Sequence, residues 1–61
     1  MEPTEDDYRL AVREACAVAD TAAITEPTKR TTWLVQAVMR RWPSLTASTA
    51  LSIVRRHPGS H

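Results

Sequence analysis

Apolar residues recur along this chain at intervals of three and four, which is the spacing of one face of an α-helix. The pattern occurs in three segments, and Pro27, Pro43 and Pro58 separate them, because proline is poorly tolerated inside a helix. No run of alternating β-branched and aromatic residues predicts a strand. We therefore expect one small all-α domain over residues 1–61, a three-helix bundle. Its helices are predicted at about residues 4–23, 29–42 and 46–57.

The same pattern predicts the helix ends and the core. Thr4 and Thr46 precede the first and third helices, where a threonine hydroxyl can cap the first turn, and Pro43 ends the second helix. Cys16 is expected at the edge of the apolar stripe of the first helix, and Ile53 at the flank of the buried face of the third. The predicted core consists of Tyr8, Val12, Ala15, Ala19, Leu34, Val35, Val38, Trp42, Leu45, Leu51 and Val54.

A chain of 61 residues has little core to stabilise it, since it buries only about 60% of the surface that its unfolded form exposes. Such domains usually depend on a disulfide, a metal or a second copy of the chain. Cys16 is the one cysteine, and with two histidines near the C-terminus it makes no metal-ligand spacing. We therefore expect no metal and no cofactor, and either good helix packing or a homodimer.

The composition also limits location and activity. No apolar run is long enough to span a bilayer, and the N-terminus is acidic, unlike that of a signal peptide, so a cytoplasmic protein is expected. Residues 58–61 are interpreted as a tail, in which Gly59-Ser60-His61 has the form of a purification-tag remnant. There is no Ser-His-Asp set, no carboxylate pair on a cleft and no glycine-rich phosphate loop. We therefore do not expect an enzyme.

Charge divides the chain into two unlike halves. Residues 1–27 carry two arginines and all seven acids, a net charge of −5, whereas residues 28–61 carry six cations and no acid, a net charge of +6. Such asymmetry is typical of a basic half that binds a polyanion. The alternative is that the two halves attract each other in the folded chain. The cations of the basic half are Lys29, Arg30, Arg40, Arg41, Arg55 and Arg56.

The predicted third helix has the kind of face that a major groove accepts. Ser48, Thr49 and Ser52 are short side chains that let a helix backbone approach base edges, and Arg55 and Arg56 can reach phosphates or guanine edges further along. The run from Leu45 to Arg56 resembles the recognition helix of bacterial and phage helix-turn-helix DNA-binding proteins. That resemblance implies that the second and third helices form the motif, with Leu45 in the core.

Double-stranded DNA is therefore the predicted partner, for a transcriptional regulator or an accessory factor of a mobile element. With about four phosphate contacts, the logarithm of the affinity would fall against the logarithm of the salt concentration with a slope of about −3.6. The predicted DNA-binding residues are Ser48, Thr49, Ser52, Arg55, Arg56, Arg40, Arg41, Lys29 and Arg30.

Two alternatives remain open. The chain could instead be a protein-interaction module, an inhibitor or adaptor that docks through the acidic first helix. Leu10, Ala17 and Ile24 form a second apolar row there, repeating every seven residues as a coiled-coil seam does, so a protein partner or a second copy is expected on this row.

Trp33 could stack on a base, or pack against the alanine face of the first helix. Trp42 is expected in the core.

Overall fold

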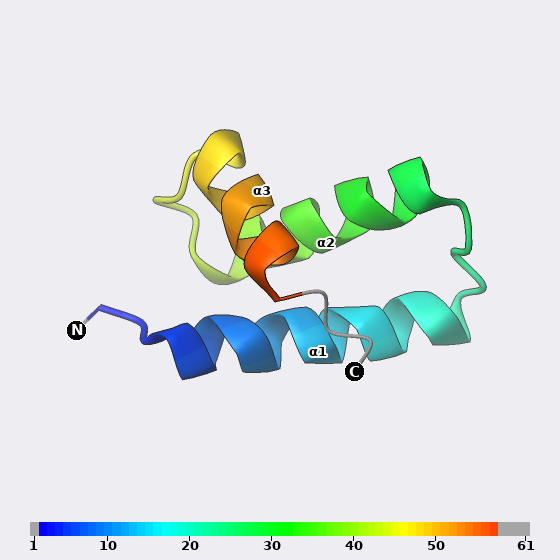
Figure 1. The fold of residues 1–61 in the computed structure, drawn as a ribbon, viewed down its shortest axis with the longest axis horizontal. Coiled ribbons are helices and arrows are strands. Elements are labelled where there is room, and N and C mark those ends of the chain that lie inside the picture. The colour runs from blue at the N-terminus through cyan, green and yellow to red at the C-terminus, as the bar shows by residue number, and fades with distance from the viewer. Residues whose placement is uncertain (1, 58–61) are drawn as a thin grey trace.

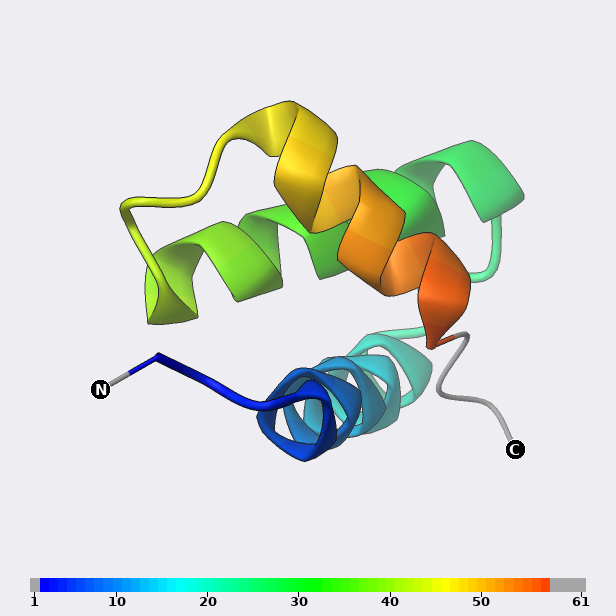
Figure 2. The same ribbon diagram turned by 60° about the vertical axis from the view of Figure 1, so that its left-hand side comes forward.

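The computed structural model describes residues 2–57, and these form three helices and no strand. Helices α1 (Glu5–Thr21) and α2 (Pro27–Arg41) run antiparallel, side by side (Figure 1). Helix α3 (Ala47–Arg56) lies on one side of that pair, and Figure 2 shows it crossing α2 obliquely. The predicted all-α three-helix bundle is confirmed. The predicted tail, residues 58–61, lies outside the described residues.

A capping box begins α1, as the sequence around Thr4 indicates. The Thr4 hydroxyl accepts from the backbone N–H of Asp7 (3.2 Å), and the Asp7 carboxylate accepts from the backbone N–H of Thr4 (2.8 Å). These bonds satisfy donors that the first turn of a helix leaves without partners. The acids of the first turn also oppose the helix dipole favourably.

Helix α1 ends at Thr21, two residues before the predicted end. Ala23 has a left-handed backbone (φ 59°), so the helix cannot continue through it. The N–H groups of Ala23 and Ile24 donate to the carbonyls of Asp20 (3.1 Å) and Ala19 (2.9 Å). This is the Schellman arrangement, which satisfies the last carbonyls of a helix and usually places glycine at the left-handed position.

Helix α2 begins at Pro27, two residues before the predicted start, because the first helical position needs no N–H and suits the fixed φ of proline. It ends at Arg41 before Pro43, so the predicted stop is confirmed. The cap predicted for α3 is also confirmed, since the Thr46 hydroxyl accepts from the backbone N–H of Thr49 (3.2 Å).

The core lies where the three helices meet. Val12 of α1, Val38 of α2 and Ile53 of α3 are at most 1% exposed and belong to one buried cluster, which also includes Cys16. The prediction for Ile53 was therefore wrong: it lies at the centre of the contact, not at its flank. The reason is that α3 packs across α2 while its last turn approaches α1 (Figure 2), and Ile53 belongs to the same buried cluster as Val12 and Cys16 of α1.

Five residues of the predicted core are only half-buried. Leu51 and Val35 line an open groove between α2 and the start of α3. Tyr8 and Trp42 meet edge to face at one end of the bundle, with ring centroids 4.9 Å apart, and the end of a small bundle remains partly open to solvent. Leu45 lies in the turn before α3. With only three helices, the bundle covers each of these side chains on one side.

Candidate nucleic-acid interface

Helix α3 turns one side to solvent. Ser48, Ser52 and Arg55 are all exposed and share this side, because their spacing of four and three residues returns to the same face of a helix. Ala50 and Ile53, on the opposite side, are buried. No acidic residue occurs in α3. We call Ser48, Ser52 and Arg55 the outer face of α3.

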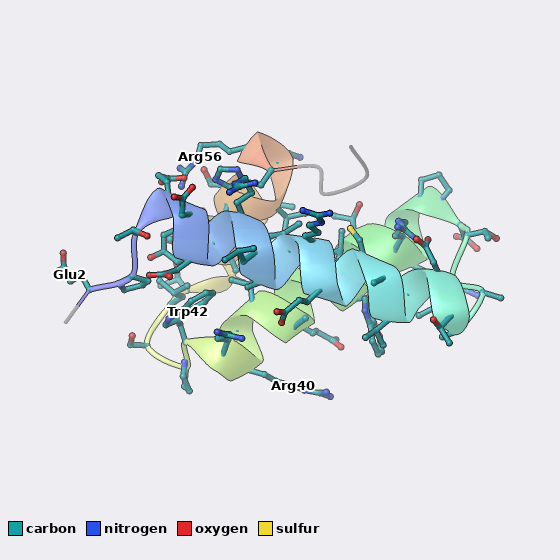
Figure 3. All side chains as sticks on the ribbon, turned by 90° about the horizontal axis from the view of Figure 1, so that it is seen from below. Glu2, Arg40, Trp42 and Arg56 are labelled. Carbon is teal, nitrogen blue, oxygen red and sulfur yellow. The ribbon has the colours of Figure 1, made fainter. Side chains whose placement is uncertain are left out.

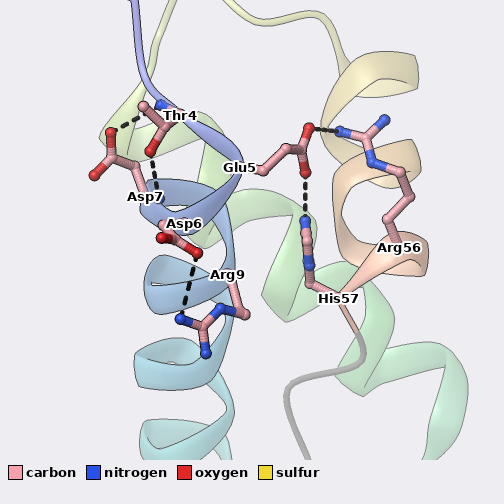
Figure 4. Close-up of polar contacts among 7 residues, drawn as sticks. All are labelled: Thr4, Glu5, Asp6, Asp7, Arg9, Arg56 and His57. Carbon is pink, nitrogen blue, oxygen red and sulfur yellow. Dashed lines mark hydrogen bonds and ion pairs between the residues drawn. The ribbon is translucent and has the colours of Figure 1, made fainter.

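Thr49 and Arg56 are exposed at the flank of α3, where both have partners within the bundle. The Thr46 hydroxyl donates to the Thr49 hydroxyl (3.0 Å). Arg56 donates to the Glu5 carboxylate (2.9 Å), and Nε2 of His57 lies 2.6 Å from the other oxygen of that carboxylate (Figure 4). The first turn of α1 therefore holds the last turn of α3.

Arg30 supports the linker between α1 and α2. Its side chain is only 23% exposed, its Nη1 lies 2.8 Å from the Asp20 carboxylate, and it donates to the backbone carbonyl of Ile24 (3.2 Å). The hydrogen bond with Asp20 raises the pKa of Arg30 above its ordinary value, so the guanidinium remains charged at all relevant pH values. Arg30 therefore fixes the hairpin of α1 and α2.

Two further cations of α2 also have carboxylate partners. Arg41 lies 3.7 Å from Glu14 of α1, and its guanidinium carbon is 5.5 Å from the centroid of the Trp42 ring. Lys29 lies 3.8 Å from Glu26, three residues earlier in the chain. These contacts are largely exposed, so each contributes little stability.

The basic half is thus partly neutralised within the fold. Arg30, Arg41 and Arg56 pair with acids of α1, which supports the interpretation that the two halves attract each other. Within residues 2–57, Arg40 and Arg55 are the cations of this half that make no ion pair. Arg40 points away from the fold on the side opposite Arg56, so the structure does not bring it to the outer face of α3 (Figure 3).

The row predicted for protein contacts is not continuous. Leu10 and Ala17 are exposed on α1, and Leu10 is 47% exposed. Ile24 lies beyond the end of α1, after the left-handed Ala23, and is half-buried. Its side chain lines a shallow groove together with Trp33, so it does not extend the helical row.

Trp33 packs inside the bundle, as one of its two interpretations predicted. It is half-buried against the core, and its indole N–H donates to the backbone carbonyl of Ala15 in α1 (3.2 Å). The ring therefore joins α2 to α1. Trp42, expected in the core, is half-buried at the end of α2.

The groove that Leu51 and Val35 line was missed in the sequence. It has a volume of about 630 Å³, extends along α2 beside the start of α3, and includes Met39 and Thr31; no charged side chain of residues 2–57 lines it. Apolar residues at helical spacing were the available signal. That spacing predicted that Leu51 and Val35 are buried. It does not show how much of a helix face a neighbour as short as α3 covers.

The described residues form neither a metal site nor a membrane span. Among residues 2–57, no three His, Cys, Asp or Glu side chains lie together so as to hold a metal ion. No helix in this part of the chain has the length and apolar character needed to cross a membrane. Comparison with known proteins found no family model, no curated protein and no solved structure that matches the chain.

Proposed function

We propose that this chain binds duplex DNA with α3 in the major groove, α2 and α3 acting as a helix-turn-helix. One observation carries the proposal: the outer face of α3 combines two short hydroxyl side chains with an arginine, all exposed and on one side of the helix. Short side chains allow close approach to base edges, and an arginine one turn further can reach a phosphate or guanine. The acids that would repel DNA lie outside α3, and Glu5, which reaches its last turn, is paired there with Arg56.

The ion pairs within the fold lower the expected number of phosphate contacts. Arg30 and Arg41 face α1, and Arg40 points away from the side on which Arg56 lies. Arg55 and the half-exposed Arg56 then remain as the cations of α3. With about two phosphate contacts, the salt slope, which is the slope of log affinity against log salt concentration, is about −1.8. The sequence alone predicted about −3.6. Binding to random duplex should then weaken by about twelvefold between 50 mM and 200 mM salt.

The decisive experiment is a titration of the full chain with random-sequence duplex at these two salt concentrations. Arg55→Ala should weaken binding and flatten the slope by about 0.9 if Arg55 contacts phosphate. Arg40→Ala is the matched control, because it removes the same charge from an exposed site that does not face the duplex. The proposal fails if the folded chain does not bind duplex at low salt, or if the two variants weaken binding equally.

A second measurement tests base contacts. Ser48→Ala and Ser52→Ala should change which sequences are selected from a random duplex pool while leaving the salt slope unchanged, since serine carries no charge. Thr32→Ala is a suitable control, because its hydroxyl is exposed on α2 and donates to the backbone carbonyl of Thr28. An unchanged selection profile for both serine variants would assign α3 to phosphate contact alone.

A further inference from the structure

A second groove lies between α1 and α2, on the side of the pair that α3 does not cover. Successive residues of a helix turn by about 100°, so Val18 lies roughly 140° around α1 from Glu5, the residue that contacts α3. The groove has a volume of about 200 Å³, and Ala11, Ala15 and Ala37 contribute small side chains to it. Small side chains let another helix approach closely.

Larger groups border these alanines. Val18 is 52% exposed, and within residues 2–57 it is one of two large apolar side chains that are exposed, the other being Leu10 at 47%. Trp33 also lines the groove, and its hydrogen bond to the Ala15 carbonyl holds the ring in place. An exposed valine beside a fixed indole is an apolar surface whose shape is set before any partner binds.

The same groove carries one charge of each sign. Glu14 comes from α1 and Arg41 from α2, and their charged atoms are 3.7 Å apart. Their side chains are 71% and 57% exposed, so both can reach a partner. A face with one acid and one base on neighbouring helices is complementary to itself after a twofold rotation, which is the requirement for a symmetric dimer.

We infer that a second copy of this chain binds in this groove, so that the two α1–α2 pairs pack face to face. Glu14 of each copy then pairs with Arg41 of the other, and the Val18 side chains become buried. The two α3 helices remain on the outside of the dimer. Dimerisation through this groove is therefore independent of DNA binding, and either property can be absent without the other.

Sedimentation equilibrium of the full chain, at concentrations up to about 1 mM, tests the interface, because a small surface of this kind associates weakly. A monomer–dimer equilibrium is expected, and Val18→Asp should raise its dissociation constant at least tenfold by placing a charge in the contact. Ala17→Asp is the matched control: it adds the same charge to the neighbouring exposed position, outside the groove. It should leave the dissociation constant nearly unchanged.

A mixing experiment separates contacts between copies from the pair within one copy. Glu14→Arg places two cations on the groove and Arg41→Glu places two acids there, so each variant alone should associate more weakly than the original chain. Mixed together, the two variants restore both pairs only across the interface. The mixed dimer should then form about tenfold more tightly than either variant with itself.

A chain that stays monomeric up to 1 mM overturns the inference. So does a mixture that associates no better than its components, or an Ala17→Asp variant that disrupts the dimer while Val18→Asp does not. Circular dichroism of each variant, recorded at low concentration, shows whether the helices are retained.

Discussion

The two sides of the α1–α2 pair are packed in different ways. On one side α3 lies across the pair, and Val12, Val38 and Ile53 are at most 1% exposed there. On the other side no helix of residues 2–57 covers the pair, and alanines with Trp33 line a shallow groove. The covered side gains its stability from branched side chains in contact. The open side limits its exposed apolar area by using small side chains and one hydrogen-bonded indole.

A chain of 61 residues therefore distributes its apolar residues unequally between the two sides of the pair. A third helix of only ten residues can cover one side of a two-helix hairpin, so the largest fully buried side chains lie on that side.

Removing the centre of the covered side should have the largest effect. Ile53→Ala should lower the free energy of unfolding by about 3 kcal/mol, because it leaves a cavity among residues that are fully packed. Val18→Ala on the open side should cost roughly 0.5 kcal/mol, since that side chain is half-exposed. Chemical denaturation at low protein concentration measures both. If Ile53→Ala does not fold, Ile53→Val should still lower the free energy of unfolding by about 1 kcal/mol. Equal losses for the Ile53 and Val18 variants would contradict the difference between the covered and the open side.

On the open side, Trp33→Phe should cost about 1 kcal/mol of stability. Phenylalanine keeps most of the ring but cannot donate to the Ala15 carbonyl, which loses the 3.2 Å hydrogen bond that joins α2 to α1. Thermal unfolding followed by circular dichroism measures the change. An unchanged unfolding temperature would mean that the indole hydrogen bond does not contribute to the open side.

The linker between α1 and α2 can be improved. Ala23→Gly should raise the free energy of unfolding by roughly 0.7 kcal/mol, because alanine pays a steric penalty at φ 59° that glycine avoids, offset in part by the greater freedom of glycine in the unfolded chain. Ala22→Gly is the matched control, since the φ of Ala22 is −82°. Ala22→Gly should destabilise the chain. A higher free energy of unfolding for both glycine variants would contradict the role assigned to the Schellman turn.

The contact between α1 and α3 should have the smallest effect on stability. Glu5→Gln should lower the free energy of unfolding by about 0.3 kcal/mol, because the Glu5–Arg56 pair is largely exposed. The same change removes an acid that competes with phosphate for Arg56, so the proposed DNA binding should strengthen, while the salt slope stays at about −1.8 because Arg56 is already one of the two expected contacts. Asp6→Asn removes the same charge one residue further on, from an acid that pairs with Arg9 of its own helix, and should strengthen binding much less. Equal affinities of the two variants for duplex would contradict a contact between Arg56 and DNA.

Local signals predicted most of the fold. The threonine at position 4 begins α1 and the one at 46 begins α3, because a hydroxyl that bonds an N–H three residues later depends only on nearby backbone. Pro43 ends α2 for an equally local reason. The early start of α2 at Pro27 and the early end of α1 were missed. Both depend on the backbone angles at single residues, which periodicity does not reveal.

The candidate site was predictable in part. Ser48, Ser52 and Arg55 share a face because helical spacing alone puts them there. Their exposure required the knowledge that α3 packs through Ala50 and Ile53, and the amphipathic pattern of the helix indicated that contact only approximately.

Sequence alone predicts the three helices, two of their caps, and the division of charge between acidic and basic halves. How the charged residues pair depends on the packing of the helices. Asp20 lies beside Arg30 and Glu5 beside Arg56 only because the hairpin and the crossing of α3 bring them together from distant positions. Spacing along one helix is set by backbone geometry, whereas a pair between helices depends on how whole faces pack. Arg40 and Arg56 therefore belong to one basic half of the sequence and to opposite sides of the molecule.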